Sequence, residues 1–286
     1  ARVAPEHKIR IVNAWQAKRK IVGMSGDGVN DAPALKQADI GIAMGITGSE
    51  VSKDAADMIL TDDNFATIVK AVTVGRNIFT NIKNAIKYLL TGNTGAIFVV
   101  IATTLLAFFD TKYVVPFAAI QLLFINLVTD SLPAIAIGTE PGTDEVLKQA
   151  PRDPKEPILT RSTFRAILIE AGLIAIAVFI GYYIGINTGE GYATTFAFLV
   201  LCLARLFNGF SCRSDLPLTK IGLFTNKNTI IAFLIGIALV SVIIFIPAIG
   251  SIFKVMTLSG AQILTIVGLA LAPTIVVQII KIIRNR

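Results

Sequence analysis

The sequence is poor in charge and in cysteine, and each shortage excludes a class of protein. Only 16% of its 286 residues are charged and 54% are hydrophobic, with a mean hydropathy of +0.71. These values exclude an ordinary soluble domain and indicate a membrane protein with a modest soluble part. The two cysteines, Cys202 and Cys212, have neither metal-ligand spacing nor a convincing disulfide context. No basic run carries interleaved aromatic residues, so nucleic acid is not expected as a partner.

The start of the chain also lacks two features. It opens on a polar stretch without an initiator Met, and no signal peptide precedes it. We therefore expect a fragment of a longer protein.

Residues 1–64 alternate short apolar runs with helical patterns, which predicts a soluble α/β domain with a parallel sheet. The segments are a helix at 9–15, a strand at 21–24, a helix at 32–38, a strand at 40–44, a helix at 50–57 and a strand at 58–60.

The loop after the first strand, residues 25–31, is a candidate ligand site because parallel α/β sheets bind ligands at the carboxyl ends of their strands. Asp27 and Asp31 could hold Mg²⁺, a hard cation that binds through one or two carboxylates. Lys8 could neutralise a phosphoryl group. Alternatively, Asn30 or Asp31 serves as the N-cap of the next helix, which does not exclude a metal role.

Proline is absent from Phe65 to Phe109, and helix formers dominate there. This pattern predicts one long helix in two parts. Residues 65–87 carry charges and form a water-exposed stalk, whereas residues 88–109 are uncharged and cross the membrane.

Five further apolar spans are expected at 114–138, 166–186, 192–211, 229–248 and 260–280, which makes six and a membrane domain over residues 88–286. Positive charge gathers before the first span, in alternate loops and in the tail, and it predicts that both ends are cytoplasmic. The basic residues beyond the first span are Lys148, Arg152, Lys155, Arg161, Arg165, Arg213, Lys220, Lys227, Lys281, Arg284 and Arg286, against Lys112 and Lys254 on the opposite side.

The second span contains a single charge, Asp130. A carboxylate inside a membrane span is expensive to bury, so it is a functional-site candidate. Asn126 and Thr129 precede it at spacings that predict three oxygens on one helix face. Pro133 loosens the helix beside the acid, as in transporter ion sites. The alternative is a proline kink with a satisfied buried aspartate.

These residues also carry a resemblance. Gly26–Pro33, with Ser25 in place of Thr, resembles the TGDGVNDAPAL hinge signature of P-type ATPases, and Arg2–Lys8 resembles their lysine segment. Asn126–Pro133 resembles the sixth membrane helix of type II calcium pumps of the sarcoplasmic reticulum kind, and Pro151–Pro157 is similar to a loop of the same pumps. The likeness runs nearly end to end.

The resemblance implies part of a haloacid-dehalogenase-like phosphorylation domain followed by membrane helices five to ten of the family. Within it, Asp27 would bind Mg²⁺ with Asp31 in support, and Lys8 and Asn30 would contact an aspartyl phosphate formed from ATP. The ligands of the transported Ca²⁺ would be Asn93, Asn126, Thr129 and Asp130.

Two positions depart from the two-ion pumps of this family. Those pumps have a Glu where this sequence has Ala96, and another in the eighth helix where Arg205 aligns. Two lost carboxylates and a gained cation should abolish one ion site. We expect one Ca²⁺ per ATP, with Arg205 as a built-in counter-charge in the second site. The alternative is that Arg205 snorkels toward the cytoplasmic interface.

The DKTGT motif that carries the phosphorylated Asp is absent, as are the family's nucleotide-binding domain, actuator domain and first four membrane helices. Alone, this chain should neither hydrolyse ATP nor pump, and its partner would be the N-terminal part of the same pump. A plasma-membrane Ca²⁺ exporter is expected. The alternatives are a pump for Mn²⁺ or Na⁺, or a non-catalytic channel or module with a relic phosphate domain. Glu170, inside a span, is expected to pair with Arg165 or Arg161 rather than to bind an ion.

Overall fold

The computed structural model describes residues 4–153 and 155–284. Arg2, Val3, Pro154 and Arg286, which entered the motif and charge arguments, lie outside the described residues. The chain divides into two compact units, one ending at Gly75 and the other beginning at Arg76, and each is described by itself.

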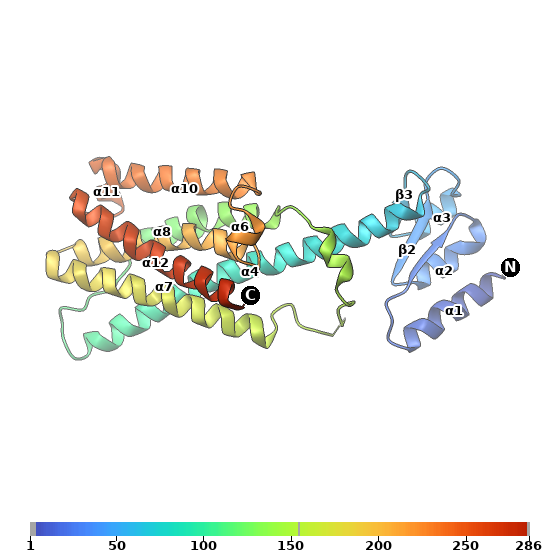
Figure 1. Ribbon diagram of the computed structural model, residues 1–286, viewed down its shortest axis with the longest axis horizontal. Helices are drawn as coiled ribbons and strands as arrows, with labels where there is room; N and C mark the ends of the chain where they lie inside the picture. The colour runs from blue at the N-terminus through green and yellow to red at the C-terminus, as the bar shows by residue number, and fades with distance from the viewer. Residues whose placement is uncertain (1–3, 154, 285–286) are drawn as a thin grey trace. The chain divides into compact units, whose positions relative to one another are not determined.

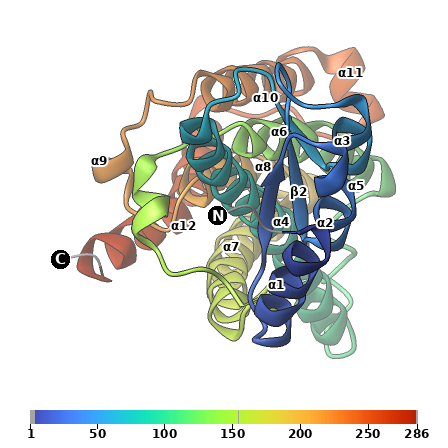
Figure 2. The same cartoon turned by 90° about the vertical axis from the view of Figure 1, so that its right-hand side faces the viewer.

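The first unit is a three-stranded parallel sheet with helices packed against it. Its elements are α1 (Pro5–Ala17), β1 (Gly23–Gly26), η1 (Val29–Asp31), α2 (Ala32–Gln37), β2 (Ile40–Met44), α3 (Glu50–Ala55) and β3 (Met58–Leu60). The strand order is β1-β2-β3, and Ser25 of β1 lies opposite Ile42 of β2. Both α2 and α3 contact β2, as the view in Figure 2 shows.

The α/β prediction is confirmed as this small parallel sheet, with shifts at the ends of elements. The first strand begins at Gly23 rather than Ile21, and α1 is longer than predicted at both ends. Pro5 stands in the first turn of α1, where its missing N–H is not needed by the helix. The second and third strands have the predicted bounds.

The long proline-free segment is one helix, α4 (Phe65–Ala107), of 43 residues. The second unit then contains α5 (Ala119–Phe124), η2 (Ile125–Thr129), α6 (Ser131–Gly138), η3 (Asp144–Lys148), α7 (Arg161–Thr188), α8 (Tyr192–Cys212), α9 (Leu218–Ile221), α10 (Lys227–Phe245), α11 (Pro247–Ile252) and α12 (Gly260–Arg284). Within the described residues, six helical segments are long and apolar enough to cross a membrane, the second being the stretch Ala119–Gly138. The six predicted spans are confirmed in that sense, and the chain is a multi-pass membrane protein.

Prolines explain where two spans depart from their predicted bounds. The second span starts at Ala119 instead of 114: Pro116 disfavours helical backbone at the residue before it, and Ala118, the N-cap, is extended. The fifth span stops at Phe245, since Ile246 precedes Pro247 and adopts an extended conformation. The Gln121 side chain accepts a hydrogen bond from the Ala118 amide at 2.9 Å and so caps the new start.

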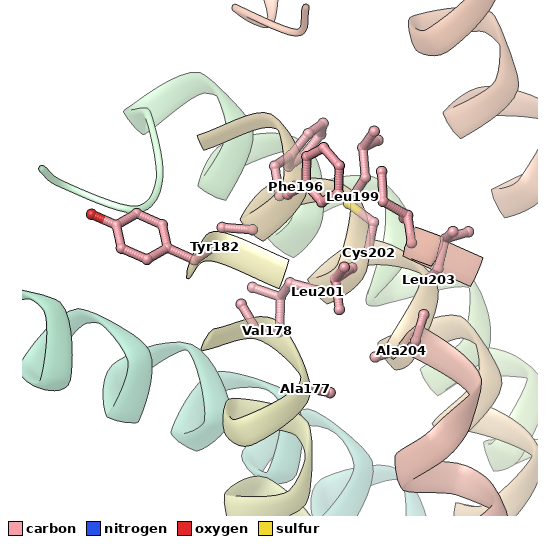
Figure 3. Close-up of a cluster of buried hydrophobic side chains, with 14 of the residues drawn as sticks. Ala177, Val178, Tyr182, Phe196, Leu199, Leu201, Cys202, Leu203 and Ala204 are labelled. Carbon is pink, nitrogen blue, oxygen red and sulfur yellow. The ribbon is translucent and has the colours of Figure 1, made fainter. Parts of the chain in front are cut away.

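The core of the second unit forms around α8, the most buried of the six spans. This helix contacts α6, α7, α10 and α12 (Figure 1). Its side chains form one buried cluster with those of α7, in which Val178 lies beside Leu201 (Figure 3). Gly185 permits the closest approach, because a Cβ there would lie 2.5 Å from the Tyr192 carbonyl oxygen. Both cysteines lie buried and free on α8.

Two ion pairs with mostly buried side chains join segments of this unit. Arg213 is bidentate to Glu140, at 2.8 and 2.7 Å, and donates to backbone oxygens of Gly222 and Leu223. Glu170 pairs with Lys87 of α4 at 2.7 Å. The expected pairing of Glu170 with Arg165 or Arg161 is therefore wrong. A buried carboxylate needs a cation that faces the helix bundle, and Arg161 and Arg165 are both exposed.

Candidate functional site

The loop after β1 brings Lys8 and Asp31 together. The Lys8 ammonium donates to Asp31 Oδ1, and the backbone amides of Asp27 and Gly28 both donate to Asp31 Oδ2 at 3.3 Å. Asp31 stands at the N-cap position of α2, but its side chain makes no capping hydrogen bond there. The N-cap alternative for Asp31 therefore does not describe the side chain, which folds back to order the loop instead.

Electrostatics keep Asp31 ionised. Burial pushes the pKa of the Asp31 carboxyl up, but the hydrogen bonds from Lys8 and Gly28 and the charge of Lys8 outweigh it, so the pKa is lowered from its ordinary value of 3.8. Gly26 fits beneath this carboxylate, because a Cβ at Gly26 would lie 2.5 Å from the Asp31 Cβ. The loop thus tolerates little change in shape.

The two carboxylates of this loop, Asp27 and Asp31, differ in the hydrogen bonds and ion pairs that they make. The Asp27 side chain is exposed, and within residues 4–153 and 155–284 it has no hydrogen bond or ion pair. The side chain of Asn30 is also exposed. Asp31 is engaged by Lys8 and two amides. The donor set therefore fits a hard cation bound through Asp27, with Asp31 as the residue that shapes the loop.

The second candidate site lies in the membrane unit, at a defect in the second span. Between α5 and α6 the backbone makes a turn of π-helix, and the Asp130 amide bonds to the Ile125 carbonyl, five residues back, at 2.9 Å. Such single-turn bulges are frequent at functional sites. The predicted loosening beside the acid is thus present, but it precedes Pro133, which lies inside α6.

Tyr88 supplies a hydrogen bond that the helix lacks at this break. Pro133 has no N–H to bond the Thr129 carbonyl four residues back, and the Tyr88 hydroxyl donates to that oxygen at 3.1 Å instead. The Thr129 hydroxyl donates to the Ile125 carbonyl at 2.9 Å. The broken segment is therefore held by a side chain from α4.

Arg205 of α8 enters the same site. One guanidinium nitrogen, Nη1, donates to Asp130 Oδ2, and Nη2 donates to Asn93 Oδ1 at 3.0 Å. Arg205 and Asp130 are both buried. Three helical segments that are far apart in sequence, α4, the η2–α6 region and α8, thus meet at the Arg205 guanidinium.

The remaining predicted ligands are placed differently. Thr129 is buried beside Asp130, whereas Asn126 is exposed, so the three side chains do not share one face as predicted. The π-turn changes the angular offset that ordinary helical spacing assumes. Ala96 is buried on α4, one turn after Gly92. Among the described residues, no group of three or more His, Cys, Asp or Glu side chains could hold a metal ion, so a cation here would need amide, hydroxyl and carbonyl oxygens beside Asp130.

Tyr88, Lys87 and Glu140 were not found by sequence reasoning. For Tyr88 a signal existed, because the carbonyl that Pro133 leaves unbonded must find a donor. For Lys87 the signal was Glu170, an acid in an apolar span that needs a buried cation. No comparable pattern marks the Arg213–Glu140 pair.

The sequence of the second unit matches a known protein family. Residues 114–283 match the family model described as "Cation transporting ATPase, C-terminus". The chain belongs to the cation-transporting P-type ATPases. It corresponds to their C-terminal portion, as the motifs predicted.

Individual relatives extend the match to the first unit. The chain is 48% identical to calcium-transporting ATPase lmo0841 of Listeria monocytogenes, over all of this chain and 32% of that protein. It is 46% identical to calcium-transporting ATPase 1 of Lactococcus lactis, over all of this chain and 32% of that protein. It is 38% identical to calcium-transporting ATPase type 2C member 2 of Rattus norvegicus, over 98% of this chain and 30% of that protein. The chain therefore spans about a third of the length of these relatives.

Proposed function

We propose that this chain is the C-terminal part of an ATP-driven cation pump that exports Ca²⁺ from the cytoplasm through an aspartyl-phosphate cycle. The observation that carries the proposal is Asp130, a buried carboxylate at a π-turn in a membrane span, with Asn93 joined to it through Arg205. The names of the relatives support calcium as the ion. The complete protein, and not this portion alone, would carry the activity.

The transported ion would bind on the open side of Asp130. Asn93 and Asn126 are both exposed in this chain, so they could contribute amide oxygens from α4 and from the π-turn. Thr129 would add an oxygen from the same turn. A further ligand would come from a helix outside this chain. Oxygen ligands select hard cations as a class, and the dependence of uptake on Ca²⁺, Mn²⁺ and Na⁺ distinguishes among them.

Charge counting supports one Ca²⁺ per ATP. Ala96 supplies no carboxylate, and Arg205 places a positive charge against Asp130. A second divalent cation at this position would meet Arg205 without a compensating acid, and at low dielectric such repulsion amounts to several kcal/mol. The burial of Arg205 and its two side-chain partners favour the counter-charge role over snorkelling to the interface.

The loop of the first unit would serve the phosphorylation step. Mg²⁺, bound through Asp27 with Asp31 holding the loop, would neutralise phosphate charge. Lys8 and Asn30 would contact the phosphoryl group. In this arrangement residues 1–64 belong to the phosphorylation domain, 65–87 form a cytoplasmic stalk and 88–286 form the membrane domain, with both ends cytoplasmic and the protein in the plasma membrane.

The test is ATP-driven uptake of radioactive calcium by vesicles that contain the complete protein. Asp130→Asn keeps the size of the side chain but removes its charge, and we expect uptake to fall to background. Asp110→Asn is the matched control, because Asp110 lies in an exposed loop and pairs with Lys112. Unchanged uptake in Asp130→Asn would contradict the proposed site.

A further inference from the structure

The Arg205 side chain crosses α4 at a residue that has no side chain. Gly92 is buried on α4, directly before Asn93. A Cβ at Gly92 would lie 2.7 Å from Arg205 Nε, 3.0 Å from Cζ and 3.2 Å from Cδ. Real carbon atoms do not approach this closely, so a methyl group at position 92 and the observed guanidinium cannot both be present.

The Arg205 side chain has little freedom to avoid such a clash. Its guanidinium is fixed by Asp130 on one nitrogen and by Asn93 on another, and the residue is almost fully buried. Moving away from α4 would break at least one of these bonds and leave a buried charge without its partner. The Arg205 Nε has no hydrogen-bond partner among the described residues, so the Gly92 side of the guanidinium supplies space rather than a bond.

Other glycines in the membrane unit have different surroundings. At Gly95, a Cβ would lie 3.3 Å from the Ala171 carbonyl oxygen and from Ile174 Cγ2, so Gly95 serves the packing of α4 against α7. At Gly172, in α7, a Cβ would have nothing within 4 Å. Gly92 differs from both, because the three atoms nearest to its missing Cβ all belong to Arg205.

We propose that Gly92 is a positioning residue for the ion site: the missing side chain admits the Arg205 guanidinium to Asp130 and Asn93. This inference rests on the proposed function in one respect, namely that Arg205 is the counter-charge that limits the pump to one Ca²⁺. A side chain at position 92 would exclude Arg205 from the site and so change how the site binds its ion.

The experiment is a double-mutant cycle in the complete protein with Gly92→Ala, Arg205→Ala and the two combined. Gly172→Ala is the control for adding a methyl group to a membrane helix at a position with space for it. Thermal unfolding in detergent measures the steric coupling. Calcium uptake in vesicles gives the rate and the Ca²⁺ concentration at half-maximal uptake. Alanine is a better helix former than glycine, so any loss in Gly92→Ala comes from the clash.

We expect Gly92→Ala to unfold at a lower temperature and to transport roughly ten- to a hundredfold more slowly, as for a misplaced site group. In the Arg205→Ala background the same change should cost no further stability, because the space is empty. Gly92→Ala and Arg205→Ala should shift the half-maximal Ca²⁺ concentration in the same direction, and the shifts should not add. Gly172→Ala should behave like the parent.

Equal losses from Gly92→Ala with and without Arg205, or no loss in either background, would overturn the inference. If Gly92→Ala does not fold, a combined variant as stable as Arg205→Ala alone still supports the inference, and a combined variant less stable than Arg205→Ala overturns it. The proposed role of Arg205 can fail separately. If Gly92 and Arg205 are coupled in unfolding, Gly92 remains a positioning residue. If Arg205→Ala also leaves the half-maximal Ca²⁺ concentration and the Ca²⁺ to ATP ratio unchanged, the one-ion proposal is contradicted.

Discussion

The two units of this chain each contain a cation paired with an aspartate, and the two pairs have different surroundings. In the first unit, the side chains of Lys8 and Asp31 are 31% and 7% exposed. In the second, those of Arg205 and Asp130 are 1% and 4% exposed. Water reaches the lysine of the loop pair but neither member of the membrane pair. An ion pair with an aspartate therefore contributes differently to the free energy of unfolding in the two units.

The difference follows from the local dielectric. Charges near water interact weakly and are screened by salt, so releasing Lys8 from Asp31 to another anion would cost little free energy. In the bundle, an unpaired charge is costly, so the Asp130 carboxylate needs at least one cation beside it, and Arg205 is that cation here. The first arrangement suits chemistry on a soluble ligand, and the second suits a site that accepts an ion from water and then encloses it.

Breaking the membrane pair should have the largest effect on stability. Arg205→Met keeps much of the side-chain volume but leaves Asp130 buried without its cation, and we expect a loss of about 3–5 kcal/mol in the free energy of unfolding. Chemical unfolding in detergent would measure it. Adding Asp130→Asn should restore most of the stability, because no unpaired charge remains. A loss of under about 1 kcal/mol in Arg205→Met would place the pair in the class of exposed ion pairs.

Removing the Tyr88 hydroxyl should have an intermediate effect. Tyr88→Phe leaves the buried Thr129 carbonyl without its donor, which should cost about 1–3 kcal/mol. It should also slow calcium uptake, because the π-turn that positions Asp130 loses its bond to α4. Tyr183→Phe is the control, since Tyr183 lies in α7 and is exposed. The same unfolding and uptake assays apply, and identical results for the two variants would remove Tyr88 from the site.

Breaking the loop pair should have the smallest effect on stability, about 1 kcal/mol or less, because Lys8 is partly exposed. Asp31 has a lowered pKa, so it stabilises the fold above the unfolded-state value of 3.8, and this stability is lost as pH falls through the folded-state pKa. Lys8→Met removes a main cause of that lowering. Unfolding measured against pH should therefore show a smaller loss of stability between neutral and acid pH in Lys8→Met than in the parent, whereas Lys36→Met, on the exposed side of α2, should follow the parent.

Much of the architecture could be predicted from patterns that depend on local sequence. The proline-free run of α4, the two later strands and the six apolar spans follow from periodicity and composition. Ends next to prolines were less accurate, because Pro116 and Pro247 act on the residue before them.

The membrane site shows where sequence reasoning stopped. It singled out Asp130, Asn93 and Arg205, but not the contacts that Arg205 makes with the other two, since these join residues that are 75 and 112 positions apart. It placed Asn126 on the same face as Asp130 because it assumed regular helical spacing, and the π-turn moved it. The sequence around Gly92 does not mark it, because the role of a glycine here depends on which side chain packs against it in the folded protein.

We propose that the Asp130 site binds one Ca²⁺ because Arg205 occupies the place of a second. The most direct test is the ratio of Ca²⁺ transported to ATP hydrolysed in sealed vesicles that contain the complete protein. We expect a ratio of one for the parent protein. A ratio of two, with Asp130 and Arg205 unchanged, would contradict it.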